Sequence, residues 1–228
     1  METVTRTTPG GSGAAGFETR VTARRPLSST AFELSLEAPA GFTFIPGQRV
    51  RLLLAGAGRD YSIVSAPGEE AIRLLIRRVE GGHISSRLAQ IPVGMPLSFT
   101  GPHGYFTFKP SSRRAVFTTT GTGIAPFCAM AAAGVAGFIL LHGAARPEEL
   151  FFSDLLRRKA AAYVGCVSER PSAAPGCFAG RVTGYLQERL PAGAYDFYLC
   201  GRQEMVRDAT LIADERFPGS LVFSEVFY

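Results

Sequence analysis

Three short polar segments carry residue types that suit the binding of a phosphorylated cofactor. The first, Gly121–Pro126, reads Gly-Thr-Gly-Ile-Ala-Pro and lies between the apolar run Ala115–Thr118 and a helical stretch. Glycines in such a turn let the backbone approach a pyrophosphate, and free N–H groups at the helix start favour an anion. Gly121 and Gly123 are therefore candidates for nucleotide binding, while the alternative is a tight connection without a ligand.

The second segment, Arg59-Asp60-Tyr61-Ser62, begins a predicted strand. Because side chains alternate along a strand, Arg59 and Tyr61 share one face. A guanidinium binds a diphosphate bidentately, and a Tyr ring packs against another ring or a ribityl chain. The alternative is the polar end of an ordinary strand.

The third segment, from Arg77 to Ser86, reads Arg-Arg-Val-Glu-Gly-Gly-His-Ile-Ser-Ser. It passes from a predicted strand through a Gly-Gly turn to a predicted helix start, where free amides and a hydroxyl make a second site for an anion. The alternative is that Ser85 or Ser86 only caps the helix.

The elements that must position these segments fall into two halves of different character. Between Phe17 and about Lys109, six short apolar runs are separated by Pro and Gly, which predicts an antiparallel β-barrel. After Pro110, four apolar strands alternate with helical patterns, which is typical of a parallel sheet flanked by helices. We expect a flexible tail at 1–16, a barrel domain at 17–111 and an α/β domain at 112–228, with a cleft between the domains.

Composition excludes several classes of function. The 228 residues are 46% hydrophobic and 19% charged, without an apolar stretch of membrane length or a signal peptide, so a cytoplasmic protein is expected. The net charge of +5 is diffuse, which argues against binding to nucleic acid. The four Cys and three His lack the spacing of metal ligands, so we predict no metal site.

Read in order, the segments RDYS, GGHIS, GPHGYF, TGTGIAP, YLCG and a terminal aromatic resemble the ferredoxin–NADP reductase superfamily over residues 17–228, in its bacterial ferredoxin or flavodoxin reductase form. The resemblance implies a Greek-key barrel that binds FAD, followed by an α/β domain that binds NADP(H). It also implies hydride transfer at flavin N5 and electron exchange with a one-electron protein carrier.

The same resemblance implies roles for individual residues. The catalytic set is Ser62, Cys200 and Glu225, with the Ser62 hydroxyl near flavin N5. The FAD contacts are Arg59, Tyr61, Ser62, Arg77, Arg78, Val79, His83, Ile84, Ser85 and Thr122, with Phe227 or Tyr228 stacked on the flavin. The NADP contacts are Gly121, Gly123, Ser168, Arg170, Arg181 and Gly201. Without the motif, Cys200 reads as an inert buried thiol.

One segment departs from the family pattern. Members that bind NADP have Ser-Arg at the site of the 2′-phosphate, and this chain has Ser168-Glu169-Arg170. A carboxylate repels a phosphate but binds a free 2′-hydroxyl. We expect NADPH to be preferred over NADH by a smaller factor than a Ser-Arg site gives.

The chain has no set of cysteines for an iron–sulfur cluster. The electron partner is therefore expected to be a separate ferredoxin, flavodoxin or other iron–sulfur protein, and the enzyme itself a monomer. The alternatives are an NADH-dependent reductase component of an oxygenase and a non-catalytic redox-sensing subunit.

The Arg59→Ala variant is expected to retain FAD less well, since a diphosphate loses a charge-assisted hydrogen-bonded fork worth about 1.5–3 kcal/mol. The measurement is the dissociation constant of FAD for the variant and the wild type. Equal dissociation constants would remove Arg59 from the site.

Overall fold

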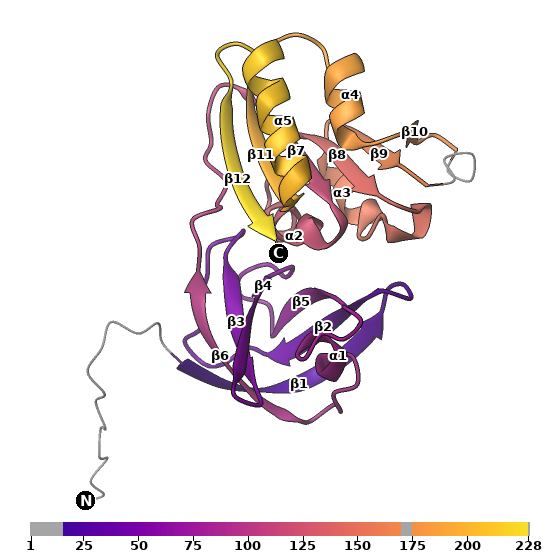
Figure 1. The fold of residues 1–228 in the computed structure, drawn as a ribbon. Coiled ribbons are helices and arrows are strands. Elements are labelled where there is room, and N and C mark those ends of the chain that lie inside the picture. Colours follow the sequence, from indigo (N-terminus) through magenta and orange to yellow (C-terminus); the bar gives the residue numbers. More distant parts are fainter. Residues whose placement is uncertain (1–15, 170–174, 228) are drawn as a thin grey trace, which may run out of the picture.

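The computed structural model describes residues 16–169 and 175–227, which form two domains stacked end to end (Figure 1). The last barrel strand ends at His103 and the first strand of the second sheet begins at Arg114, so the predicted boundary at residue 111 falls in the connection. Most of the predicted tail, residues 1–15, lies outside the described residues.

The first domain is a six-stranded antiparallel sheet closed into a barrel. Its strands are β1 (Gly16–Pro26), β2 (Ala31–Glu37), β3 (Arg49–Leu54), β4 (Ala57–Ser62), β5 (Ala71–Arg77) and β6 (Pro96–His103). They lie in the order β4-β3-β6-β1-β2-β5, and a bridge between Ile63 and Leu74 joins the two edges. Strands β3 to β6 thus follow one another as β6-β3-β4-β5 in space, which is the Greek key that was expected.

Local sequence explains the barrel's turns and core. The β3–β4 hairpin turns at Ala55 and Gly56, both with positive φ, the backbone that matches the twist of paired strands. Inward residues of the alternating strands, such as Leu52 and Phe99, are fully buried. One short helix, α1 (Ser85–Leu88), lies between β5 and β6.

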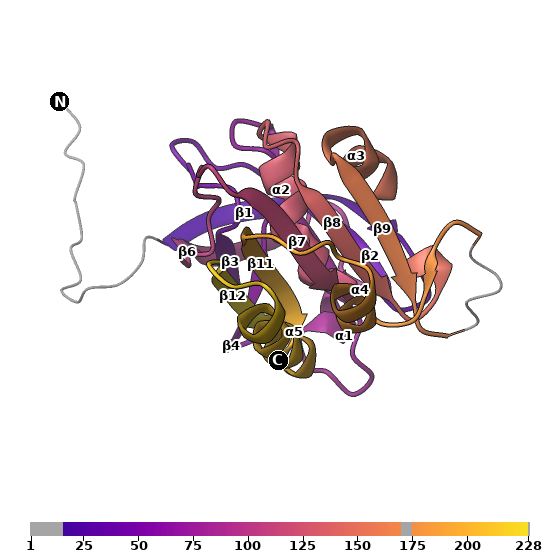
Figure 2. The ribbon, with the colours of Figure 1, turned by 90° about the horizontal axis from the view of Figure 1, so that it is seen from above.

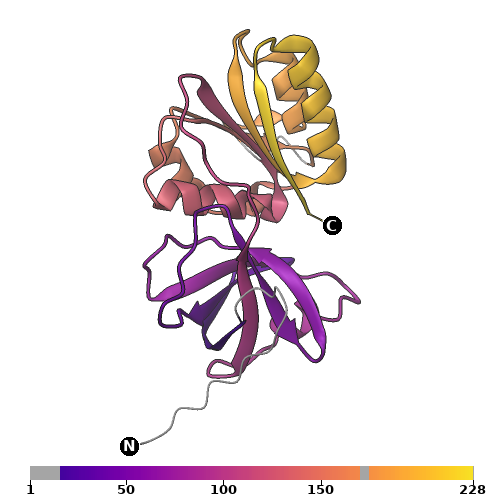
Figure 3. The ribbon, with the colours of Figure 1, turned by 90° about the vertical axis from the view of Figure 1, so that its left-hand side faces the viewer.

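The second domain is a parallel sheet covered on both faces. Its strands are β7 (Arg114–Thr120), β8 (Ile139–Ala144), β9 (Ala162–Val167), β10 (Phe178–Ala179), β11 (Tyr195–Arg202) and β12 (Leu221–Phe227), in the order β10-β9-β8-β7-β11-β12. Its helices are α2 (Ala125–Ala132), α3 (Ser153–Lys159), α4 (Val182–Glu188) and α5 (Gln203–Arg216). Helices α2 and α3 lie on one face and α4 and α5 on the other (Figures 2 and 3).

Alternation along β7 divides the core of this domain. Phe117 faces α2 and stacks on Phe127 and Phe138 at centroid distances of 4.6 and 4.4 Å. Its neighbour Val116 faces the other way and belongs to the cluster that contains Leu186 of α4. Both faces of the strand are therefore buried, which explains why its consecutive residues Ala115, Val116 and Phe117 are all apolar.

Helix α2 lies between the sheet and the barrel. All of its residues from Ala125 to Ala131 are buried, because the cluster around Phe117 also contains Val64, Leu75 and Phe106 from the barrel side. A Cβ at Gly47 of the barrel would lie 2.8 Å from the Met130 methyl group. The two domains therefore share an apolar contact and pack as one body.

The strand order of the second sheet reverses between β7 and β11. In parallel sheets, ligands bind outside the carboxyl ends of the strands at such a switch point. The ends of β7, β11 and β12 face the barrel (Figure 1). The topology thus directs Thr120, Arg202 and Phe227, the last residues of these strands, toward the junction of the domains.

Two local features differ from the sequence prediction. One of the helical patterns of the second half, Glu148–Ala161, is divided in the structure, where a 3-10 turn at Pro147–Glu149 and α3 are separated at Phe152, whose φ is +58°. The six strands of the second sheet exceed the four predicted. Strand β10 is only two residues long, and β12, although it contains the apolar run Leu221–Phe223, was not predicted as a strand. None of the helices in the described ranges has the length and apolar character that a membrane crossing requires.

Phe117→Ala is expected to lower the free energy of unfolding by about 3–5 kcal/mol, because it opens a cavity between two stacked rings. The matched control is Leu211→Ala on the exposed side of α5, where the side chain is 54% exposed and the loss should stay within about 0.5 kcal/mol. Urea unfolding of both variants makes the comparison. Equal losses would mean that Phe117 is not a core residue.

Candidate functional site

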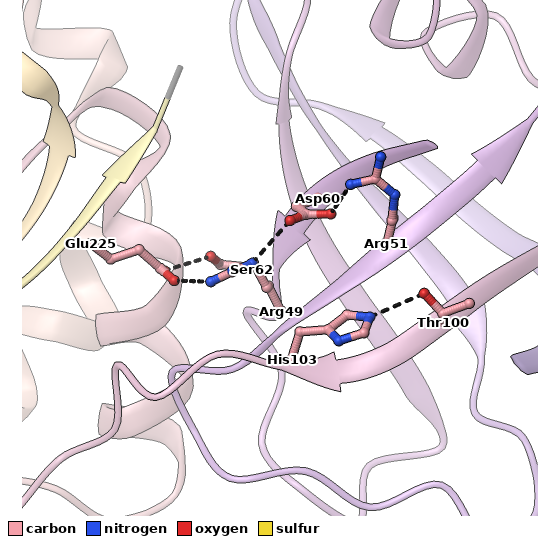
Figure 4. Close-up of polar contacts among 7 residues, drawn as sticks. All are labelled: Arg49, Arg51, Asp60, Ser62, Thr100, His103 and Glu225. Atoms are coloured by element: carbon pink, nitrogen blue, oxygen red, sulfur yellow. Dashed lines mark hydrogen bonds and ion pairs between the residues drawn. The ribbon is translucent and has the colours of Figure 1, made fainter. Parts of the chain in front are cut away.

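The two domains exchange polar contacts around the carboxylate of Glu225, near the end of β12 (Figure 4). Arg49 Nη1 donates to Glu225 Oε1 at 2.5 Å, and the Ser62 hydroxyl donates to Oε2 at 3.5 Å. Arg49 Nε also donates to Asp60 Oδ2 at 3.1 Å, and Arg51 Nη1 donates to Asp60 Oδ1 at 3.0 Å. The site is therefore a junction of charges from β3, β4 and β12.

Strand register brings these side chains together. Arg49 of β3 is paired with Ser62 of β4, so both side chains lie on the same face of the barrel. In the second sheet, Glu225 is paired with Cys200 of β11, and Cys200 with Thr119 of β7. Cys200 thus lies beside Glu225 on the neighbouring strand.

Burial sets the electrostatics of this junction. The Glu225 side chain is only 10% exposed, and desolvation raises the pKa of its carboxyl group, while the charge and hydrogen bond of Arg49 act in the opposite direction. Cys200 is fully buried, and burial together with the Glu225 charge raises the pKa of its thiol well above the ordinary value. Cys200 is therefore a neutral thiol near neutral pH.

The glycine turn that the sequence singled out starts at the end of β7. It forms a 3-10 turn, Gly121–Ile124, that runs directly into α2. A Cβ on Gly123 would overlap the carbonyl oxygen of Cys200, and one on Gly201 would overlap the Thr120 hydroxyl. These two glycines allow the turn and β11 to approach each other, whereas Gly121 has open space beside its Cα and, like Thr122, is only partly buried.

Arg59 and Tyr61 lie on the same face of β4, as predicted. Burial raises the pKa of Tyr61 to about 12, and the nearby Arg59 charge opposes this rise. The Tyr61 hydroxyl is buried and has no hydrogen-bond partner among the described residues. An unsatisfied buried hydroxyl is costly unless a ligand or water completes it.

Part of the third predicted segment lines an open surface cavity of about 310 Å³, whose lining residues are Gly81, Gly82, His83, Ser86, Arg87 and Gln90. Arg77, Arg78 and Val79, which precede these residues in the chain, are exposed. The Ser85 hydroxyl is buried and accepts a hydrogen bond from the Val79 amide, and Ser86 donates to the Val79 carbonyl. The alternative that one of these serines only caps the helix is wrong, because the N-cap of α1 is Ile84, without a side-chain hydrogen bond.

The residues predicted for the 2′-phosphate lie at a different edge. Ser168 and Glu169 follow β9 and are exposed, and Arg181 is the exposed N-cap of α4. Glu169 forms an ion pair with Arg146 at 3.5 Å, a partner that follows β8 and that sequence reasoning missed. Arg170, Tyr228 and the side chain of Phe227 lie outside the described residues, so their predicted contacts stay predictions.

Sequence reasoning also missed Arg49. It stands between Gln48 and Val50 in an alternating strand, where an arginine carries no signal of its own. Its partner Glu225 is 176 residues away in the sequence. Only the fold shows that the two side chains meet.

Comparison with known proteins shows to which family the chain belongs. The profile of the oxidoreductase FAD-binding domain matches residues 19–108, and that of the oxidoreductase NAD-binding domain matches residues 117–210. Ferredoxin–NADP reductase B of Sorangium cellulosum is 37% identical over 215 residues, which cover 83% of this chain and 88% of that protein. The chain belongs to the ferredoxin–NADP reductase superfamily. It is a flavin- and nicotinamide-dinucleotide-dependent oxidoreductase, as the sequence predicted.

Other relatives share the fold or part of their length. The toluate 1,2-dioxygenase electron transfer component of Pseudomonas putida is 33% identical over 208 residues, which cover 84% of this chain but only 61% of that protein. A solved ferredoxin NADP+ reductase from Neisseria gonorrhoeae with bound FAD and NADP has a TM-score of 0.80 at 22% identity, covering 93% of this chain and 99% of that one. This structural likeness confirms the two-domain fold.

The described residues fit both dinucleotides. On the barrel side, the unsatisfied Tyr61 hydroxyl and the cavity at Gly81 and Gly82, with Arg87 in its wall, suit a flavin with a diphosphate. On the sheet side, the open surface at Gly121 leads into the first turn of α2, where backbone amides suit an anion. Ser62, next to Tyr61 on β4, and Cys200, whose carbonyl lies beside Gly123, both border Glu225.

Accessibility and thiol pKa predict which cysteine reacts first. Burial raises the pKa of Cys128, Cys166 and Cys200, to about 12 for Cys166, whereas Cys177 is half-buried. Because the thiolate is the nucleophile, a disulfide reagent at neutral pH is expected to modify Cys177 rapidly and the other three only after unfolding. Mass mapping of labelled peptides makes the measurement, and Cys177→Ser, which should label slowly throughout, is the control. Rapid labelling of Cys200 would contradict the burial described above.

Proposed function

We propose that this oxidoreductase transfers electrons between NADP(H) and a one-electron protein carrier through bound FAD. The observation that carries the proposal is the convergence of Ser62, Glu225 and Cys200 where the barrel meets the switch point of the parallel sheet. One hydroxyl, one carboxylate and one thiol border this point. A protein that only bound the two dinucleotides would have no chemical need for this set.

The residues of the chain position the two cofactors. Arg59 and Tyr61 hold the diphosphate and the ribityl part of FAD, with His83, Ile84 and Ser85 near the diphosphate and Arg77–Val79 along the flavin. Gly121 receives the nicotinamide dinucleotide at the start of α2, and the neighbouring Thr122 contacts the flavin. FAD bound there would supply the chemistry of hydride acceptance and single-electron transfer. Ser62 and Glu225 orient the reacting groups, and the neutral Cys200 thiol closes the site against water.

The electron carrier is a separate protein, either a ferredoxin or a flavodoxin. No group of three or more His, Cys, Asp or Glu in the described ranges is arranged to hold a metal ion. The identity of 37% to the ferredoxin–NADP reductase relative, against 33% to the dioxygenase component, supports a carrier reductase.

A second candidate is the NADH-dependent reductase component of an oxygenase. The ferredoxin–NAD(+) reductase component of the alkene monooxygenase system of Xanthobacter autotrophicus is 32% identical over 226 residues, covering 91% of this chain. The exposed Glu169 favours this reading, since a carboxylate suits a ribose with a free 2′-hydroxyl.

An absorbance experiment tests the proposal. Purified protein should be yellow with one FAD per chain, and anaerobic NADPH should bleach the flavin absorbance, which a ferredoxin or flavodoxin then restores. Protein that takes up no FAD, or a bound flavin that NADPH does not bleach, would contradict the proposal. If NADH bleached the flavin absorbance and NADPH did not, the result would favour the second candidate, the reductase component of an oxygenase.

The ion pair between Arg146 and Glu169 bears on the choice of nicotinamide. Both side chains are more than half exposed, at 57% and 59%, so the pair is weak and its members can separate. A 2′-phosphate would compete with Glu169 for Arg146, and Arg181 stands near the same end of the sheet. We propose that NADPH is preferred, and that Glu169 reduces the preference by occupying a cation.

Glu169→Gln is expected to raise the ratio of kcat/KM for NADPH to that for NADH by about two- to fivefold, the range for loss of one exposed charge contact. The matched control is Glu148→Gln, an acidic residue in the neighbouring 3-10 turn without an ion pair to Arg146 in the structure. Steady-state kinetics with both nucleotides decide. A ratio that falls, or that rises equally in both variants, would exclude Glu169 from the specificity site.

A further inference from the structure

Arg49 is the one side chain in Figure 4 that touches two carboxylates. Its Nη1 binds Glu225 of the second domain at 2.5 Å, and its Nε binds Asp60 of the barrel at 3.1 Å. The two bonds use different N–H groups of one planar guanidinium, a geometry that a lysine cannot reproduce. Asp60 therefore fixes the orientation in which Arg49 meets Glu225.

We propose that Arg49 is a positioning residue of the reaction, which holds the Glu225 carboxylate ionised and aligned beside Ser62. The inference rests on the proposed function, because it names the residue that prepares the same site. Arg49 itself need not touch either cofactor. Its action passes through Glu225.

The geometry makes Arg49, more than Ser62, the anchor of Glu225. The Arg49 contact is 2.5 Å long, whereas the Ser62 hydroxyl lies 3.5 Å from the other carboxylate oxygen, at the limit of a hydrogen bond. Gly104 keeps the space for this contact, since a Cβ there would lie 2.9 Å from Arg49 Nη1 and 3.6 Å from Glu225 Oε1. The absence of a side chain at Gly104 thus allows Arg49 and Glu225 to form their contact.

The surroundings of Glu225 predict what the loss of Arg49 would do. Burial and the Asp60 charge both raise the pKa of Glu225, and the charge and hydrogen bond of Arg49, with a hydrogen bond from Ser62, lower it. Cys200 lies beside it on β11, and the His103 ring on β6 is engaged with Thr100 Oγ1 at 3.0 Å. Without Arg49, the groups that raise the pKa prevail, so Glu225 would take up a proton at higher pH.

If Arg49 had a purely structural role, its substitution would have different effects. An ion pair that only joined the domains would, when broken, lower stability or flavin content without moving the pH dependence of the reaction. A positioning residue changes that pH dependence and lowers kcat more than it raises KM for the nucleotide. The two roles can therefore be separated.

The first experiment uses the FAD-loaded full chain and its variants Arg49→Gln, Arg49→Lys and Arg51→Gln. Arg51 is the matched control, because it lies on the same strand, binds Asp60 and makes no contact with Glu225 in the network of Figure 4. Rapid-mixing measurements follow flavin reduction by NADPH across pH. Arg49→Gln should lose about tenfold or more in the rate at neutral pH, the effect of one charge-assisted hydrogen bond, and its acid limb should move to higher pH. Arg49→Lys should recover part of the rate, and Arg51→Gln should keep the wild-type pH profile.

The second experiment does not depend on activity. A carboxyl group whose pKa is raised in the folded protein lowers stability as pH rises from its unfolded pKa to its folded pKa, and has no effect at lower pH, where the group is protonated in both states. The Arg49→Gln variant should therefore lose stability relative to the wild type increasingly as pH rises from acid to neutral. The same substitution is then made in a chain that also carries Glu225→Gln. There the pH-dependent loss should be smaller, because only the contact of Arg49 with Asp60 still contributes to it.

The outcomes separate the inference from the function on which it rests. The proposal is overturned if Arg49→Gln keeps the wild-type pH profile. It is also overturned if the pH-dependent loss of stability caused by Arg49→Gln is the same in the wild-type and Glu225→Gln backgrounds, since Arg49 would then not act through Glu225. If NADPH fails to reduce the flavin of the wild type, the proposed function is wrong, and the unfolding series still decides whether Arg49 keeps Glu225 ionised.

Discussion

A buried carboxylate needs a cation, and in this protein the cation comes from the other domain. Glu225 belongs to the last strand of the parallel sheet, and Arg49 belongs to the third strand of the barrel. Neither domain on its own supplies both partners. The contact that compensates the charge of Glu225 therefore also fixes how the end of β12 meets the barrel, and Ser62 and Cys200 take their places around it.

Other features of the fold help to bring Arg49 and Glu225 into contact. The reversal of strand order between β7 and β11 directs the strand ends to the junction, and Gly123 lets the turn after β7 pack against the carbonyl of Cys200. A side chain at Gly123 would push the turn away from β11. The small residues of this region thus determine how near the nucleotide domain can bring its groups to the barrel.

The sequence predicted the features that depend on local pattern. Turn residues and alternating patterns predicted the two-domain fold, and the order of the motifs predicted the family; both predictions are confirmed. Alternation along one strand predicted that Arg59 and Tyr61 share a face. The contact of Arg49 with Glu225 could not be predicted, because it joins residues 176 positions apart and depends on how two domains dock. The break at Phe152 was missed for a different reason, since a helical pattern does not reveal a single residue with positive φ. The roles of the individual cofactor contacts stay predictions.

Helix α2 determines the spacing of the two domains. Its sequence, Ala-Pro-Phe-Cys-Ala-Met-Ala-Ala, has small side chains at five of its eight positions if Cys128 is counted with the alanines, and it is enclosed by the sheet on one side and the barrel on the other. The width of this one helix thus sets the distance between the FAD-binding domain and the sheet of the NAD-binding domain. A larger side chain on the barrel side of α2 would change the angle between the two domains. Such a change in angle would move the strand ends of the sheet relative to the barrel. The spacing of the two domains is therefore sensitive to the volume of the side chains with which α2 faces the barrel.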